Sequence, residues 1–311
     1  MKSAARLIMP NAITRSELLK RRLDRFTRVL DGLEKGEVRA LHRARVASRR
    51  LRELVPMLQL DHGLSKKLSR RLRRVTIHLG HVRELDVLLM MVDELHVSRR
   101  SHGTALGRVG MAVSKDRDRA RRKLFSRLPM TEMRRLSGKL SRTVSALQHD
   151  ETSSSKSASR AWKWSLDARI ARRAARLSAA IQDAGALYLP ERLHAVRIAL
   201  KKLRYAAELS NEVAGRRGDA DIRLLKRGQE LLGRMHDLQV LIDHVRQLQA
   251  SLAPPSVAVW RDLDALMEML EDDCRRLHAR YMRARDELAQ IAVRLGAEHT
   301  PTRSHAARRA G

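Results

Sequence analysis

Two segments of the chain place one histidine and three cations along a single helical face. In LHRARVASRRLREL, residues 41–54, and in LHAVRIALKKLRYA, residues 193–206, these side chains recur three or four residues apart. At about 100° per residue they share an arc of about 80°, and Ala and Leu occupy the opposite face. We call these two sets the basic stripes: they are His42, Arg45, Arg49 and Arg52, and His194, Arg197, Lys201 and Arg204.

The residue types in the basic stripes favour a phosphate ligand, because guanidinium groups bind phosphate oxygens two at a time. A solvated helix face usually mixes acids with bases, but neither stripe contains an acid. The stripes therefore predict a surface that follows a chain of phosphates, and a solvated face is the alternative for any single arginine-rich helix. Each histidine would donate to phosphate when protonated; alternatively, it caps or packs its own helix.

A second pair of similar segments follows the stripes. HLGHVRELDVLL, residues 78–89, and LLGRMHDLQVLI, residues 231–242, lie 153 residues apart, while the stripes lie 152 apart. Two similar blocks in the same order indicate a duplicated helical unit. We expect Gly80 and Gly233 to end their helices, with salt-bridged caps. Three cations before each block also correspond: Arg70, Arg73 and Arg74 match Arg223, Lys226 and Arg227.

Few helix breakers interrupt the rest of the chain. Only 7 Pro and 15 Gly occur, and Leu, Ala and Arg recur at three- and four-residue spacing, which predicts an all-α protein. We expect residues 151–160, rich in serine, to form a flexible linker between a first helical repeat, 1–150, and a second, 161–297, with 298–311 as a disordered basic tail. The expected helices are 13–33, 38–60, 64–79, 83–98, 104–127, 130–148, 161–186, 190–213, 219–233, 236–251 and 256–295.

The composition limits the classes of function. With 65 Lys and Arg against 35 Asp and Glu, the net charge of +30 requires anionic partners or counterions. The single cysteine, Cys274, excludes an internal disulfide framework and fits a reducing compartment. No apolar stretch approaches a membrane span, and the N-terminal apolar patch is too short for a secretory signal, so we expect a cytoplasmic protein. Aromatic residues make up only 3% of the chain, which disfavours a surface that stacks bases.

We do not expect an enzyme. Phosphoryl transfer needs a phosphate loop and carboxylates that hold magnesium, but the sequence has no G-x-x-x-x-G-K-[ST] motif and no acidic cluster near either stripe. An acidic group at residues 271–273 precedes Cys274 and His278. A metal site would need four ligands, so we interpret this segment as a solvated surface with a half-buried cysteine. Neither a metal nor a cofactor is expected.

The duplicated pattern H-x-x-R-[VI]-x-x-[RK]-[RK]-L-R, followed by L-G-x-x-[RH]-[DE]-L-x-V, resembles the CHAD family, the conserved histidine α-helical domain, over about residues 13–290. The resemblance implies a helical bundle of two four-helix-type halves related by pseudo-twofold symmetry. It also implies a basic central cavity or groove that binds inorganic polyphosphate, and a location at polyphosphate granules. Many members carry a triphosphate tunnel domain, but its E-x-E-x-K signature is absent from this sequence. No polyphosphatase or cyclase activity is therefore carried over.

The polyphosphate-binding positions that the resemblance implies follow the repeat. They are His42, Arg45, Arg49, Arg50, Arg52 and Arg73, and His194, Arg197, Lys201, Lys202, Arg204 and Lys226. The second L-G motif departs from the first at three positions, where Arg83, Glu84 and Asp86 are replaced by His236, Asp237 and Gln239. This departure weakens the case that the L-G motifs themselves contact the ligand.

Two other functions stay open. A charge of +30 attracts DNA or RNA whatever the fold, so non-specific nucleic-acid binding is the first. The second is a scaffold that bridges polyphosphate granules to the chromosome or to protein partners. The charge is uneven, at +21 over residues 1–150 and +9 over residues 151–311. A scaffold would use the stripes for polyphosphate and the N-terminal cations for the other partner.

Overall fold

A computed structural model describes residues 13–153, 156–215, 220–252 and 256–300 of the chain. Over these ranges the regular structure is helical and no strand occurs, which confirms the all-α prediction. None of the helices described offers an apolar stretch long enough to cross a membrane. The α-helices are α1 (Arg15–Thr27), α2 (Leu30–Glu34), α3 (Val38–Leu54), α4 (His62–Ser98), α5 (Gly103–Arg127), α6 (Met130–Ser153), α7 (Lys156–Ala184), α8 (Pro190–Ala214), α9 (Ala220–Ala250) and α10 (Val257–Glu298).

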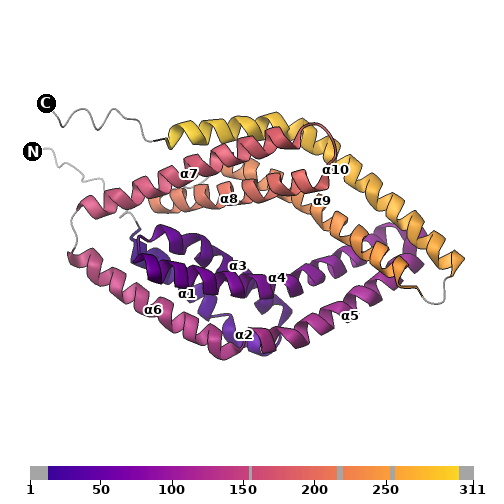
Figure 1. Cartoon of the computed structure of the whole chain (residues 1–311), viewed down its shortest axis with the longest axis horizontal. Helices are drawn as coiled ribbons and strands as arrows, with labels where there is room; N and C mark the ends of the chain where they lie inside the picture. The colour runs from indigo at the N-terminus through magenta and orange to yellow at the C-terminus, as the bar shows by residue number, and fades with distance from the viewer. Residues whose placement is uncertain (1–12, 154–155, 216–219, 253–255, 301–311) are drawn as a thin grey trace, which may run out of the picture.

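Helices α1–α6 lie along one side of the molecule and α7–α10 along the other (Figure 1). On the first side α3 packs against α4, α4 against α5, and α1 against both α3 and α6. On the second side α7 packs against α8 and α10, and α9 against α8 and α10. Helices α4 and α5 also contact α9, so the two sides form one body. The pseudo-twofold relation between them stays a prediction.

The helices that carry the basic stripes are fixed by their apolar faces. In α3, Ala47, Leu51 and Leu54 are buried in the core, on the face that the sequence predicts to lie opposite the first stripe. In α8, Leu203 and Ala206 are buried in the same core opposite the second stripe. Because burial of apolar surface sets the rotation of each helix, both stripes must point away from the core.

The expected helix ends at Gly80 and Gly233 are wrong. Helices α4 and α9 run through both glycines without a break. Neither glycine has the left-handed backbone that ends a helix, whereas Gly215 has a φ of 67° and follows the last residue of α8. Leu79, Val82 and their neighbours keep the apolar face of α4 buried across Gly80, which outweighs the cost of about 1 kcal/mol for a glycine within a helix.

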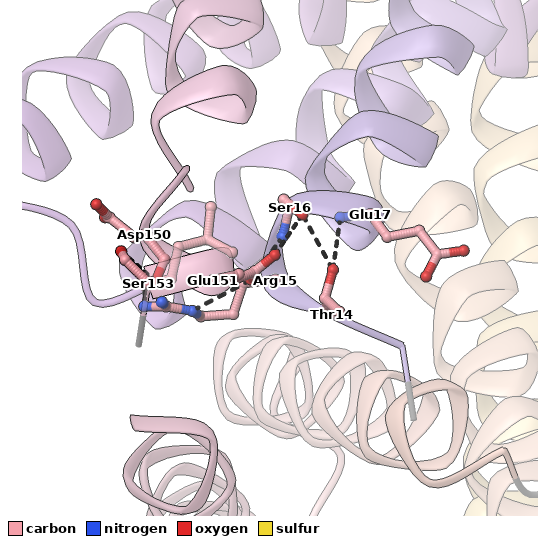
Figure 2. Close-up of polar contacts among 8 residues, drawn as sticks. Thr14, Arg15, Ser16, Glu17, Asp150, Glu151 and Ser153 are labelled. Carbon is pink, nitrogen blue, oxygen red and sulfur yellow. Dashed lines mark hydrogen bonds and ion pairs between the residues drawn. The ribbon is translucent and has the colours of Figure 1, made fainter. Parts of the chain in front are cut away.

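Most of the segment that was expected to form a flexible linker is helical. Helix α6 continues to Ser153 and α7 begins at Lys156, so most of residues 151–160 is helical; residues 154–155 and 301–311 lie outside the described ranges. Figure 2 shows how Glu151 is held at the start of α1. Its carboxylate accepts the backbone N–H of Ser16 at 3.2 Å and lies 3.6 Å from the Arg15 guanidinium. A carboxylate at a helix N-terminus is stabilised by the helix dipole, which orders this end of α6.

A buried ion pair joins α7 to α3 behind the stripes. Arg173 of α7, which is 7% exposed, donates to the Glu53 carboxylate of α3. The same guanidinium donates to the backbone carbonyl of Lys202 in α8 at 2.7 Å. One side chain therefore connects three helices, including the two that carry the basic stripes.

Candidate functional site

Helices α3, α4, α8 and α9 surround a cavity of about 560 Å³, in which the two basic stripes meet. We call it the central cavity. Five of the twelve predicted binding residues line it: Arg45 and Arg49 from α3, and His194, Arg197 and Lys201 from α8. The sequence placed these side chains on separate helices, and the structure brings them to one space.

Four of the cations that line the central cavity stand close together without compensating ion pairs, whereas a fifth, Arg234, pairs with Glu94. None of Arg45, Arg49, Arg197 and Lys201 forms an ion pair with any residue that the structure describes. Burial, then the charges of Arg197 and Arg49, lowers the pKa of Lys201 to about 8. Burial, then Arg49, likewise lowers the pKa of Arg45. The cavity therefore holds a concentration of positive charge that an anion would stabilise.

Two hydrogen-bond donors in the central cavity lack partners. The Nε atoms of Arg45 and Arg49 are buried and donate to no described group. A buried donor left in this state costs about 1–3 kcal/mol, and a phosphate oxygen would satisfy it. The arrangement is that of a binding site prepared for oxygen atoms with negative charge.

The glycines of the two L-G motifs border the same space. The Arg45 guanidinium lies over Gly80, where a Cβ atom would be 3.5 Å from its Nε. Gly233 lines the central cavity, and no atom lies within 4 Å of the place where its Cβ would stand. A Cβ at Gly80 would make ordinary van der Waals contact with Arg45, whereas a side chain at Gly233 would extend into the open space of the cavity.

Tyr205 connects the two stripes and was missed by the sequence analysis. The Arg49 guanidinium of α3 lies 5.0 Å from the centre of the Tyr205 ring, and that of Arg204 lies 4.5 Å from it. Arg204 also donates to Gln229 at 2.9 Å and pairs with Glu208. Arg204 is thus bound to protein groups at the edge of the site, and the tyrosine holds Arg49 in place by a cation–π contact.

A pair of histidines lies on the α8–α9 side of the central cavity. The Nδ1 atoms of His194 and His236 are 3.2 Å apart. Burial, then Arg197, lowers the pKa of both, and that of His236 falls to about 4. Both rings are therefore neutral near pH 7. The sequence gives one signal for His236, which is its match to Arg83 in the repeat.

Carboxylates from the neighbouring helices also reach the central cavity, although neither stripe itself contains an acid. Glu84 of α4 and Glu230 and Asp237 of α9 line it. Burial raises the pKa of Asp237, although Arg197 opposes this change. Among the described residues, no three side chains of the types that bind metals come together. The acids were hidden from the sequence analysis because they lie on the neighbouring helices and not on the stripes.

The other seven predicted residues do not line the central cavity. Arg52 lies 3.7 Å from Glu53, and Lys226 lies 3.7 Å from Glu230, which does line it. The pKa of His42 is lowered by burial and then by Arg83. The full set comprises His42, Arg50, Arg52, Arg73, Lys202, Arg204 and Lys226.

The Cys274 segment differs from its expected form. Cys274 is fully buried instead of half-buried, because it faces the core side of α10. The acids beside it are engaged in ion pairs: Asp272 with Arg275, and Asp273 with Arg276. His278 packs edge-on against Tyr188, with ring centres 5.4 Å apart. These contacts give the segment a structural role in the packing of α10.

The helices that form the central cavity lie within the part of the chain that matches known proteins. The model of the CHAD domain family matches residues 17–246. The chain is similar to the crystal structure of the CHAD domain from the plant Ricinus communis, with a TM-score of 0.56 and 22% identity, over 90% of this chain and 96% of that one. It is also similar to PptA from Streptomyces chartreusis, with a TM-score of 0.61 and 18% identity, over 89% and 98%. The sequence matches none of the curated proteins.

Proposed function

Because this chain belongs to the CHAD domain family, we propose that it binds inorganic polyphosphate in the central cavity and does not cleave it. The observation that carries the proposal is the meeting of Arg45 and Arg49 with Arg197 and Lys201 in one space. Binding would place the protein at polyphosphate granules in the cytoplasm, which it would organise or mark.

The chemistry of the central cavity supports a chain of phosphates over a single anion. Cations from two helices face one another there, so successive phosphate groups along one chain can meet them in turn. The buried Nε donors of Arg45 and Arg49 require acceptors with oxygen geometry. Polyphosphate is thin, flexible and rich in such oxygens, whereas a nucleic-acid duplex is too wide for a cavity of about 560 Å³.

We expect long-chain polyphosphate to outcompete duplex DNA at physiological salt. A labelled polyphosphate chain bound to the protein is titrated with either competitor at matched total phosphate, at two salt concentrations. Both affinities will fall with salt through counterion release. The distinguishing result is the ratio of the affinity for polyphosphate to the affinity for DNA, because only the thin polyphosphate chain reaches the buried donors.

Equal displacement by DNA at equal phosphate would contradict this function. Phosphorus NMR of the same samples with added magnesium or manganese reports on the chain itself, and we expect its length to stay constant. Steady growth of orthophosphate that a cavity substitution abolishes would show the proposed absence of cleavage to be wrong.

Nucleic-acid binding by a granule scaffold is the second candidate, and one surface favours it. The pKa of Lys139 of α6 is lowered by the nearby Arg71 and Lys67 of α4 and also by Arg142. Lys67 and Arg142 are exposed, Lys139 and Arg71 are half-buried, and none of the four lines the central cavity, so a duplex could reach this surface. In the competition experiment, simultaneous binding of DNA and polyphosphate, without displacement, is the result that this candidate predicts.

Affinity for long chains should increase as the pH falls, in two steps. Burial and neighbouring cations lower the pKa values of Lys201, His194 and His236, and a bound polyanion would raise them again, so binding would be coupled to proton uptake. Lys201, with its pKa of about 8 in the free protein, should contribute as the pH falls to about 8, because below that value it is already protonated before binding. The histidines should contribute below about pH 7. For each proton taken up on binding, the affinity can rise by at most about tenfold per pH unit, and titration calorimetry can measure this rise.

A double histidine variant tests whether His194 and His236 cause the gain in affinity below about pH 7. In H194Q/H236Q the gain below about pH 7 should disappear while the Lys201 step remains. The matched control is His62→Gln, because His62 is exposed at the start of α4 and lies outside the central cavity. A wild-type pH profile in H194Q/H236Q would mean that the two histidines serve only the packing of α8 and α9.

A further inference from the structure

A second basic cavity, of about 680 Å³, lies between α4, α5 and α9. We call it the lateral cavity. Its cations come from α5, at Arg119, Lys123 and Arg127, and its histidines are His78, His81 and His244. None of these residues belongs to the basic stripes, and none lines the central cavity.

The α5 cations are arranged as a row on one face. Arg119, Lys123 and Arg127 are four residues apart, so they follow one another along successive turns. Arg119 pairs with Asp116, but neither Lys123 nor Arg127 forms an ion pair with a described residue. Two cations in the lateral cavity are therefore available to an anion.

A hydrogen bond fixes which ring nitrogen of His244 on α9 carries the proton. The Nδ1 of His244 lies 2.9 Å from the backbone carbonyl of Val240 and must donate to it, because a carbonyl oxygen only accepts. Its Nε2 is then the nitrogen left for a ligand, and it becomes a donor once the ring is protonated. His78 lies close to the Arg127 charge, which, after burial and Arg74, lowers its pKa.

The lateral cavity also has an apolar wall. Ile77, Leu85 and Leu124 line it, and Ile77 is 54% exposed, so aliphatic surface beside the cations is open to a ligand. A site with convergent polar groups and apolar walls is typical of small-molecule binding, and its volume lies within the usual range for such sites. The wall distinguishes this cavity from a surface that only follows a phosphate chain.

We propose that the lateral cavity binds the phosphate groups of a small phosphorylated molecule. The row of Lys123 and Arg127 would hold a diphosphate or triphosphate group, with His244 as a further donor. The source of that group is either a short inorganic oligophosphate or a nucleotide, and only the nucleotide would also use the apolar wall. The lateral cavity shares no lining residue with the central cavity, so this proposal does not rest on polyphosphate binding there.

The test uses charge reversal in the full chain. K123E/R127E is compared with K115E/R122E, which reverses two exposed cations of the same helix that do not line the lateral cavity. Both are made in an R45E/K201E background, which disables the central cavity. Titration calorimetry with tripolyphosphate and with ATP should show a loss of at least about tenfold for K123E/R127E and less than about twofold for the control.

Side-chain NMR of the histidines locates the ligand. Tripolyphosphate or ATP should shift the signals of His78, His81 and His244 in the R45E/K201E background. Tighter binding of ATP than of tripolyphosphate identifies the nucleotide as the ligand class, and the reverse order identifies the inorganic chain.

Two results would overturn the lateral site. Equal weakening by K115E/R122E would mean that the ligands respond only to net charge. Unmoved histidine signals, with no binding once the central cavity is disabled, would mean that short phosphates use the central cavity alone. Failure of the polyphosphate function is separate, because it would appear as wild-type long-chain affinity in R45E/K201E.

Discussion

Reversing either pair of cations in the central cavity should remove most of the affinity for long-chain polyphosphate. The variants are R45E/R49E on α3 and R197E/K201E on α8. Charged hydrogen bonds contribute about 1.5–3 kcal/mol each, so loss of two corresponds to at least about a hundredfold rise in Kd. Each variant should show the whole effect, because Arg45 and Arg49 lie near enough to Lys201 to lower its pKa. Titration calorimetry measures the affinity and the number of sites.

The matched control for these variants is K115E/R122E, which removes the same charge from an exposed face of α5. It should lower long-chain affinity only slightly, through net charge. Short oligophosphates cannot span both stripes, so they should bind weakly and distinguish little between the two cavity variants. If each cavity variant kept about half of the sites at unchanged affinity, the stripes would be independent and the shared site would be wrong. Circular dichroism confirms that the helices remain intact.

Glu53→Ala should destabilise the fold by about 3–5 kcal/mol, because it leaves the Arg173 guanidinium buried without its partner. Burial alone would raise the pKa of Glu53, but Arg173 overrides this and the pKa is lowered. The contribution of the pair is therefore present above the unfolded pKa of the carboxyl and is lost as the pH falls through the folded value. Urea unfolding at pH 7 measures the loss, and the difference from wild type should shrink in acid.

Glu132→Ala serves as the control for this prediction. Its partner is Arg74, 3.5 Å away, and both side chains are about half exposed. An exposed pair of this kind contributes about 0–1 kcal/mol. Similar losses in the two variants would show that the Arg173–Glu53 contact carries no special weight in holding α7 to α3.

The fold class and the rotation of the stripe helices could be predicted from sequence because both depend on local periodicity. Ala47, Leu51 and Leu203 fall on the faces that the core buries, as their spacing requires. The lengths of α4 and α9 could not be predicted in this way. Gly80 and Gly233 have the composition of a helix end, but the contacts that α3, α5, α8 and α10 make along α4 and α9 stabilise unbroken helices.

The residues of the candidate site could likewise be predicted where local spacing reveals them, but not where tertiary contacts place them. Arg45, Arg49, Arg197 and Lys201 were found because they repeat at helical spacing in two segments. Tyr205 was missed, since its role depends on Arg49, which is far away in the chain. His236 carried a signal that was misinterpreted: it occupies the place of Arg83 in the repeat, and variation at a repeated position need not remove it from the site.

Helices α4 and α9 are walls of both cavities. On α4, Glu84 borders the central cavity and His81 the lateral one, three residues apart. On α9, Val240 borders the central cavity and His244 the lateral one, four residues apart and joined by a hydrogen bond. Because the two cavities share these helices, any effect that occupancy of one cavity has on affinity in the other must be reciprocal: the coupling free energy is the same in both directions.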